Sequence, residues 1–88
     1  MLPLLCGASK LAKSLRSRRH KALLAVLVGS RKEAGLTQRQ VAVKWKRPQS
    51  TLAAVETGER RLDVVEFYEL AQALGVDPVA LFERFARW

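Results

Sequence analysis

Apolar residues recur at helical spacing along most of the chain, in blocks separated by glycine, proline and capping residues. From Ser9 to Val28 there is no proline or glycine, and apolar side chains recur at roughly helical spacing. This stretch predicts a long first helix that ends at Ala34-Gly35, where the glycine can take the left-handed conformation. No segment alternates with enrichment in β-branched residues as a strand does, so the pattern predicts an all-α fold.

The next two helices are predicted by their end signals. Residues 37–40 match a capping box, so a second helix opens there and runs to about Trp45. Pro48 suits the first turn of a third helix over residues 48–56, because it lacks the N–H that goes unpaired there, and Gly58 ends that helix. Two short helices joined by a tight turn have the layout of a helix-turn-helix unit.

The last two helices carry similar signals. Residues 63–66 form a second start of capping-box type, and this fourth helix ends at Leu74-Gly75. Asp77-Pro78 opens a fifth helix that we expect to reach the C-terminus. A domain this small cannot easily bury every apolar residue of that helix, so its end is expected either to fold back on the first helix or to meet a second subunit of a homodimer. The residues concerned are Leu81, Phe82, Phe85 and Trp88, with Phe85 and Trp88 as the dimer candidates.

Length and charge narrow the function classes. With 88 residues, 49% of them apolar, the chain has room for one domain, which excludes a two-lobed enzyme with a cleft between its lobes. Sixteen lysines and arginines against eight acidic residues give a net charge of +8, which attracts a polyanion, most often nucleic acid. Residues 1–32 hold eight basic residues and no acidic one. We therefore divide the chain into a basic N-terminal extension, 1–19, that is disordered or helical, and a domain, 20–88.

Other chemistries find little support in the sequence. The single cysteine, Cys6, cannot form an internal disulfide, which indicates a cytoplasmic protein. No apolar run approaches the roughly 18 residues that indicate a membrane-spanning helix. The sequence shows no glycine-rich phosphate loop, metal-ligand spacing or paired nucleophile and base. We expect no enzymatic activity, no cofactor and no bound metal.

A longer run of residues carries a family resemblance. The run comprises Leu27, Arg31, Gly35-Leu36-Thr37-Gln38, Val41-Ala42, Pro48-Gln49-Ser50-Thr51-Leu52, Val55-Glu56, Gly58-Glu59-Arg60-Arg61, Leu70-Ala71 and Ala73-Leu74-Gly75-Val76-Asp77. In order and spacing it resembles the XRE-like helix-turn-helix family, of phage repressor and Cro type, over about residues 23–85. The resemblance implies a compact five-helix, repressor-like DNA-binding domain whose helix-turn-helix unit spans 37–56.

The resemblance also implies roles for individual residues. Arg31 and Glu56 match an ion pair that ties the first helix to the third. The third helix is the recognition helix of the family, and its base-contact positions are Gln49, Ser50, Thr51, Ala53 and Ala54. The candidates for phosphate contact are Gln38, Lys44, Lys46, Arg47 and Arg60, with Arg61 as a further candidate.

Three features depart from the family pattern. Lys46 stands where many relatives have the turn glycine, and Pro48 stands where a serine or threonine cap is usual. Ala53 and Ala54 occupy places where relatives often carry longer polar side chains. Because alanine offers only a methyl group, base readout by this helix should be thinner than in those relatives.

Three hypotheses follow for the function. The first is a sequence-specific transcriptional regulator, a repressor of bacterial or phage origin, which binds double-stranded DNA as a dimer with helix 48–56 in the major groove; the basic stretch 9–20 would add contacts along the DNA. The second is a protein-interaction adaptor or antitoxin-type module that holds a toxin or another protein, which the small residues Ala53 and Ala54 slightly favour. The third, and least favoured, is that residues 1–19 lie on anionic lipid as an amphipathic helix.

Overall fold

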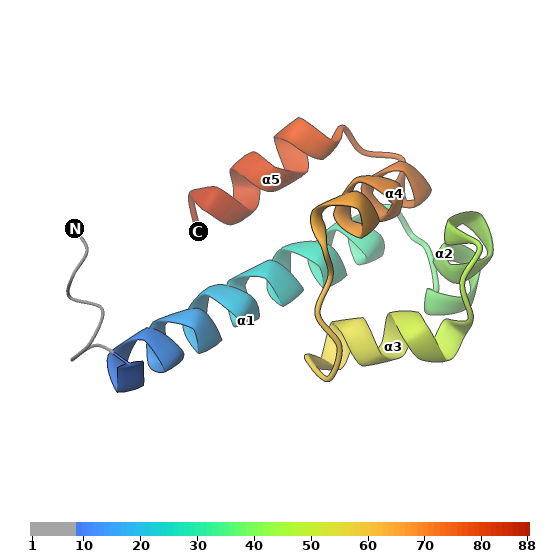
Figure 1. Cartoon of the computed structure of the whole chain (residues 1–88). Helices are drawn as coiled ribbons and strands as arrows, with labels where there is room; N and C mark the ends of the chain where they lie inside the picture. Colours follow the sequence, from blue (N-terminus) through green and yellow to red (C-terminus); the bar gives the residue numbers. More distant parts are fainter. Residues whose placement is uncertain (1–8) are drawn as a thin grey trace.

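A computed structural model describes the backbone of residues 9–88 and the side chains from residue 18 onward. Five α-helices follow one another, and within residues 9–88 no strand occurs (Figure 1). The expectation of an all-α, five-helix domain is confirmed. Cys6 and the other residues of 1–8 lie outside the described part of the chain. The helices are α1 (Ser9–Glu33), α2 (Gln38–Trp45), α3 (Gln49–Thr57), α4 (Val64–Leu74) and α5 (Pro78–Ala86).

The helix ends follow the capping residues in the sequence. The Thr37 hydroxyl accepts a hydrogen bond from the N–H of Gln40 at 3.1 Å, and the Gln40 side chain accepts one from the N–H of Thr37 at 2.8 Å. Asp63 and Glu66 form the same reciprocal pair at the start of α4, at 2.7 and 3.2 Å. Gly58 ends α3 in the left-handed conformation, with φ 87°. Both predicted capping boxes and this predicted stop are confirmed.

The start of the third helix differs by one residue from the prediction. Pro48 precedes α3 as its N-cap, with φ −60° and ψ 148°, rather than standing in its first turn. The ring fixes φ near the helical value, but the extended ψ makes Pro48 the point at which the chain turns into the helix. No side chain caps the first amides of α3. The helix therefore covers Gln49–Thr57 instead of 48–56.

The last helix is shorter than the pattern predicts. α5 ends at Ala86, and Trp88 lies beyond it with 68% of its surface exposed. Phe85 is half-buried and packs against the core, while Arg19 of α1 donates a hydrogen bond to its carbonyl oxygen at 3.2 Å. The end of α5 thus folds back on α1 through Phe85, whereas Trp88 stays exposed.

The longest helix is α1, which runs unbroken through the boundary that we drew between residues 19 and 20. Its first turns extend beyond the other four helices (Figure 1). Its contribution to the core comes from the second half, where Ala22, Val26 and Leu27 are at most 3% exposed. At its C-terminal end Arg31 and Lys32 lie in the last turn, where positive charge is favourable.

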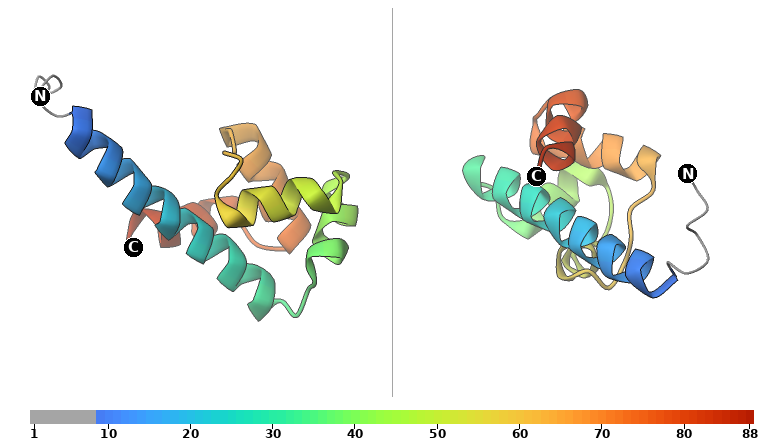
Figure 2. Two further views of the ribbon diagram at one scale, coloured as in Figure 1. Left: turned by 90° about the horizontal axis from the view of Figure 1, so that it is seen from below. Right: turned by 90° about the vertical axis from the view of Figure 1, so that its left-hand side faces the viewer.

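The core lies where the helices meet, and it fixes the outward face of α3. α2 packs against α3 and α4, and α1 packs against α3 and α5. In Figure 1, α5 lies above α1 and α3 lies below it; Figure 2 gives two further views of the same packing. Side chains that are at most 1% exposed come from four helices, and they are Val41, Leu52, Val55, Leu70, Ala71 and Leu81. Because α3 buries Leu52 and Val55, its other side remains at the surface.

Candidate nucleic-acid interface

The N-terminal end of α3 presents polar side chains to solvent. Gln49 and Ser50, the first two residues of the helix, are both exposed. Leu52 and Val55 point into the core, each 1% exposed, so the polar pair lies on a different side of the helix. The remaining base-contact candidates, Thr51, Ala53 and Ala54, are half-buried. The structure therefore places two hydrogen-bonding side chains at the surface at this end of α3.

A short polar network connects that end of α3 to the start of α2. Gln38 is the first residue of α2, and its amide nitrogen donates to Glu56 Oε1 at 2.8 Å. The Gln38 amide oxygen in turn accepts from Gln49 Nε2 at 3.5 Å, a long contact. The two glutamines proposed for phosphate and base contact are thus brought together, and Gln38 is oriented by a buried carboxylate.

The carboxylate of Glu56 is held by α1. Arg31 Nε donates to Glu56 Oε2 at 2.7 Å, and Arg31 Nη2 donates to Glu56 Oε1 at 3.1 Å. Only 13% of the Arg31 side chain and 7% of the Glu56 side chain are exposed. Arg31 Nη1 also donates to the carbonyl oxygen of Leu36 at 3.0 Å. This pair joins α1, the loop before α2, and α3, so it helps to set where α3 lies relative to α2.

A hollow beside the network is lined by a basic side chain, Arg39, that was not among the phosphate-contact candidates predicted from the sequence. Arg39 is exposed in the first turn of α2 and lines this hollow together with Gln38 and Gln49. The signal was present in the sequence, since Arg39 directly follows Gln38 in a segment free of acidic residues. Arg39 therefore joins the candidates for phosphate contact.

The turn between α2 and α3 carries two exposed lysines. Lys44 lies in the last turn of α2, and Lys46 ends that helix with φ 62° and ψ 39°. Among residues 9–88, Lys46 is the one non-glycine residue with positive φ. A side chain in this left-handed region is strained relative to glycine, which explains why glycine is the usual residue at such a turn. The departure at this position therefore places a cation beside α3 on a strained backbone.

Arg47 and Arg60 both bind one carboxylate. Arg47 Nη1 donates to Glu66 Oε2 at 3.0 Å, and Arg60 Nη2 donates to the same oxygen at 2.7 Å. Hydrogen bonds from Arg60 and from the Asp63 N–H, together with the charges of the two arginines, lower the pKa of Glu66 from its usual 4.5 to about 2. Sequence reasoning missed Glu66 in this role, since it identified Glu66 only as part of a capping box.

The ring of Trp45 supports the same turn from inside. Trp45 is 4% exposed and belongs to the core, and the guanidinium carbon of Arg47 lies 5.1 Å from its ring centre. The Trp45 Nε1 atom is buried and has no hydrogen-bond partner. Trp45 therefore acts as a packing surface for the turn, with an unpaired buried N–H.

Two further observations concern other chemistries. Among the residues that the structure describes, no three His, Cys, Asp or Glu side chains gather in a way that could hold a metal ion. None of the described helices combines the length and the apolar character needed to cross a membrane.

Comparison with known families and proteins agrees with this geometry. A family model described as a helix-turn-helix domain matches residues 10–85. An uncharacterized HTH-type transcriptional regulator of Sinorhizobium fredii, y4dJ, is 47% identical over 60 residues, which cover 62% of this chain and 78% of that protein.

Solved structures show the same fold. An XRE-family like protein from Pseudomonas syringae superposes with a TM-score of 0.84 at 39% identity, covering 90% of this chain and 96% of that one. The restriction-modification controller protein C.AhdI from Aeromonas hydrophila superposes with a TM-score of 0.66 at 30% identity, covering 72% and 96%.

Proposed function

Because the chain belongs to the XRE-type helix-turn-helix family of DNA-binding transcription regulators, we propose that it represses transcription by binding a specific double-stranded DNA site with α3 in the major groove. The proposal assigns binding and no catalysis to this chain. Since DNA is the ligand, the protein acts in the bacterial cytoplasm, on the nucleoid or on phage DNA.

The observation that carries the proposal is the exposed polar end of α3. The Gln49 side chain is exposed, and its amide makes one long hydrogen bond, from Nε2 to Gln38. A glutamine amide can pair with both N6 and N7 of adenine. Ser50 is exposed beside it and can contact either kind of base pair. Thr51, Ala53 and Ala54 are half-buried, so less of their surface is open to a base, and the two alanines can offer only methyl contacts, for example with thymine. We therefore assign most of the base readout to Gln49 and Ser50.

Candidate phosphate contacts lie on both sides of Gln49 and Ser50. Gln38 lies at the N-terminus of α2, where the helix dipole favours an anion, and Arg39 is exposed next to it. Lys44 and Lys46 are exposed at the other end of α2. Arg47 and Arg60 are each about one-third exposed despite their bonds to Glu66, and Arg61 is exposed in the loop after α3. Such contacts position the protein on the duplex without reading its sequence.

The experiment selects duplexes from a library of randomised 30-base-pair DNA and then measures affinity for the enriched duplex and for random duplex. The proposal expects an enriched duplex bound about 10³-fold or more tighter than random DNA. It also expects Gln49→Ala to lose about 1–3 kcal/mol of binding free energy on the enriched duplex. The control is Gln72→Ala, since Gln72 is an exposed glutamine on α4. Equal, weak binding to all duplexes would contradict the proposal.

We further propose that the active form is a homodimer joined through the α5 side of the molecule. Phe82 is 53% exposed although it meets Phe67 and Phe85 edge-on, and Trp88 is 68% exposed nearby on the chain. A two-fold dimer would present two copies of α3 to half-sites about 34 Å apart. Sedimentation of wild type, Phe82→Ser and Trp88→Ser tests this: the variants should shift toward monomer, and a monomeric wild type at the concentrations that bind DNA overturns it.

A protein partner is the second candidate function. Its support is a group of exposed apolar side chains on α4, at 83% for Val64, 65% for Val65 and 53% for Tyr68. An adaptor or antitoxin-type module would use such a surface to hold a toxin or another protein. Equal, weak binding of all duplexes in the selection, combined with a monomeric chain, would favour this function over DNA recognition.

A further inference from the structure

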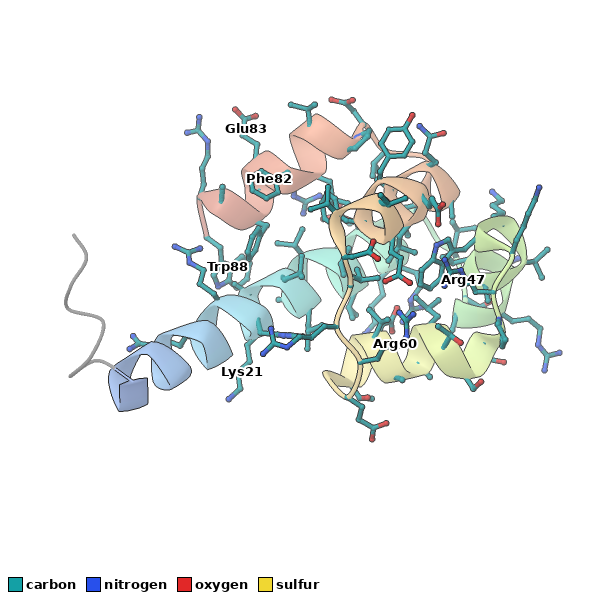
Figure 3. All side chains as sticks on the ribbon, in the orientation of Figure 1. Lys21, Arg47, Arg60, Phe82, Glu83 and Trp88 are labelled. Carbon is teal, nitrogen blue, oxygen red and sulfur yellow. The ribbon has the colours of Figure 1, made fainter. Side chains whose placement is uncertain are left out.

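The turn before α3 and the loop after it are tied to the same side chain. Arg47 lies in the turn that precedes α3, and Arg60 lies in the loop that follows it. Both reach Glu66 in the first turn of α4: Arg47 Nη1 and Arg60 Nη2 donate to Oε2 at 3.0 and 2.7 Å, and Arg60 Nη1 donates to Oε1 at 3.3 Å. Figure 3 labels the two arginines on the side of α3 that faces α4. One carboxylate thus fixes both connections of the recognition helix.

The Glu66 carboxylate is itself firmly placed. Its residue is 8% exposed, and Oε1 also accepts the N–H of Asp63 at 3.2 Å, which completes the capping box of α4. Hydrogen bonds to both oxygens hold one orientation of the carboxylate and favour its ionised form. Glu69, one turn further along α4, approaches Arg47 Nη2 only at 3.5 Å and is 45% exposed. Glu66, and not its neighbour, is the anchor of the pair.

The two guanidinium groups keep surface for a ligand. The side chains of Arg47 and Arg60 are 34% and 38% exposed. A guanidinium carries five N–H donors, more than either arginine uses on Glu66, and its planar fork suits phosphate oxygens. Both guanidinium groups share the Glu66 carboxylate, and the second carboxylate nearby, that of Glu69, reaches only Arg47 and is 45% exposed. Arg47 is further held by its stacking on Trp45.

We propose that Glu66 is a positioning residue for DNA binding, which holds Arg47 and Arg60 ready for two phosphate contacts at the two ends of α3. This inference rests on the proposed DNA-binding function. Long side chains lose conformational freedom when they bind a phosphate, and prior ordering by Glu66 reduces that loss. Charge repulsion alone predicts that removing an acidic residue near DNA increases the affinity for DNA. Positioning by Glu66 predicts the opposite, a loss of affinity when its charge is removed.

The test compares Glu66→Gln with Glu69→Gln, which removes the same charge one turn away on the same helix. The affinity for a random-sequence 30-base-pair duplex and for the selected duplex is measured at several salt concentrations. Glu66→Gln should weaken binding about tenfold or more and reduce the slope of log affinity against log salt, by about 0.9 for each phosphate that the protein no longer neutralises. Glu69→Gln should bind as tightly as wild type or more tightly, with an unchanged slope.

The salt slope separates positioning from simple loss of folding. Because the stability of a chain with a net charge of +8 itself depends on salt, the folded fraction of each variant is measured by circular dichroism at every salt concentration. The affinity is corrected for that fraction, so a slope that is still reduced reports lost phosphate contacts. The variant Arg47→Gln/Arg60→Gln should show the reduced slope, and adding Glu66→Gln to it should change the slope no further. If the wild type binds DNA and Glu66→Gln binds with the same affinity and the same salt slope, this inference is overturned and the proposed function stands. If the wild type binds no duplex, the proposed function and the inference are both overturned.

Discussion

Arg31 on α1 and Glu56 on α3 form a two-bond ion pair, with the Nε–Oε2 and Nη2–Oε1 distances at 2.7 and 3.1 Å. Both side chains are largely buried, and Glu56 also accepts a hydrogen bond from Gln38. The pair therefore links α1 to the network that connects Gln38 with the candidate base-reading glutamine, Gln49.

Replacing one member of this pair should destabilise the fold much more than replacing both. Glu56→Gln or Arg31→Met leaves its partner buried with an unmatched charge, which costs about 3–5 kcal/mol. The double variant Arg31→Met/Glu56→Leu should cost less than either single change. Urea denaturation followed by circular dichroism measures all three. A double variant as unstable as the sum of the single ones contradicts this account of the pair.

Lys46→Gly should stabilise the protein. The left-handed conformation of Lys46 costs about 1–2 kcal/mol for a residue with a side chain, and glycine recovers part of this against its greater freedom in the unfolded chain. We expect a net gain of about 0.5–1 kcal/mol in the free energy of unfolding. Lys46→Ala is the control, because it removes the same charge but keeps the strain. If alanine stabilises the chain as much as glycine does, charge rather than backbone strain is responsible.

Acid should destabilise the fold through Glu66. Arg60 and the Asp63 N–H hold the pKa of Glu66 at about 2 in the folded protein, below its usual 4.5. The unfolded chain therefore takes up a proton at this residue first, and stability that is fully present above about pH 5 is lost as the pH falls toward 2. Thermal melts between pH 2 and 7 should show a weaker pH dependence for Glu66→Gln. Glu69→Gln should keep the dependence of the wild type.

Trp45→Phe should be nearly neutral, although Trp45 lies in the core. The change removes a buried N–H that has no partner, and leaving such a group unpaired costs about 1–3 kcal/mol. This relief offsets much of the cost of the smaller ring, so the loss should be about 1 kcal/mol or less. Trp45→Ala, which leaves a cavity, should lose about 3–5 kcal/mol. A large loss in the phenylalanine variant, measured by circular dichroism in urea, would indicate a partner for the N–H.

Local signals along the chain were enough to predict the helices and most of their ends. Capping boxes act between residues three positions apart, as Thr37 and Gln40 do, and a stop such as Gly58 depends on its own backbone. Such signals need no tertiary contact to be interpreted. The prediction was wrong at two helix ends: Pro48 became a cap, and α5 stopped at Ala86, before Trp88.

Which cations are exposed and which are held in ion pairs depends on how the helices pack. In the sequence Arg47, Arg60 and Lys44 are equivalent cations, but packing α4 against α2 brings Glu66 to Arg47 and leaves Lys44 exposed. The loop that leads into α4 brings Arg60 to the same carboxylate. Arg47 and Glu66 are 19 residues apart, and no local pattern sets the distance between them. Ion pairs across the chain depend on where whole helices come to rest, which follows from burying the core and not from the neighbours of each residue in the sequence.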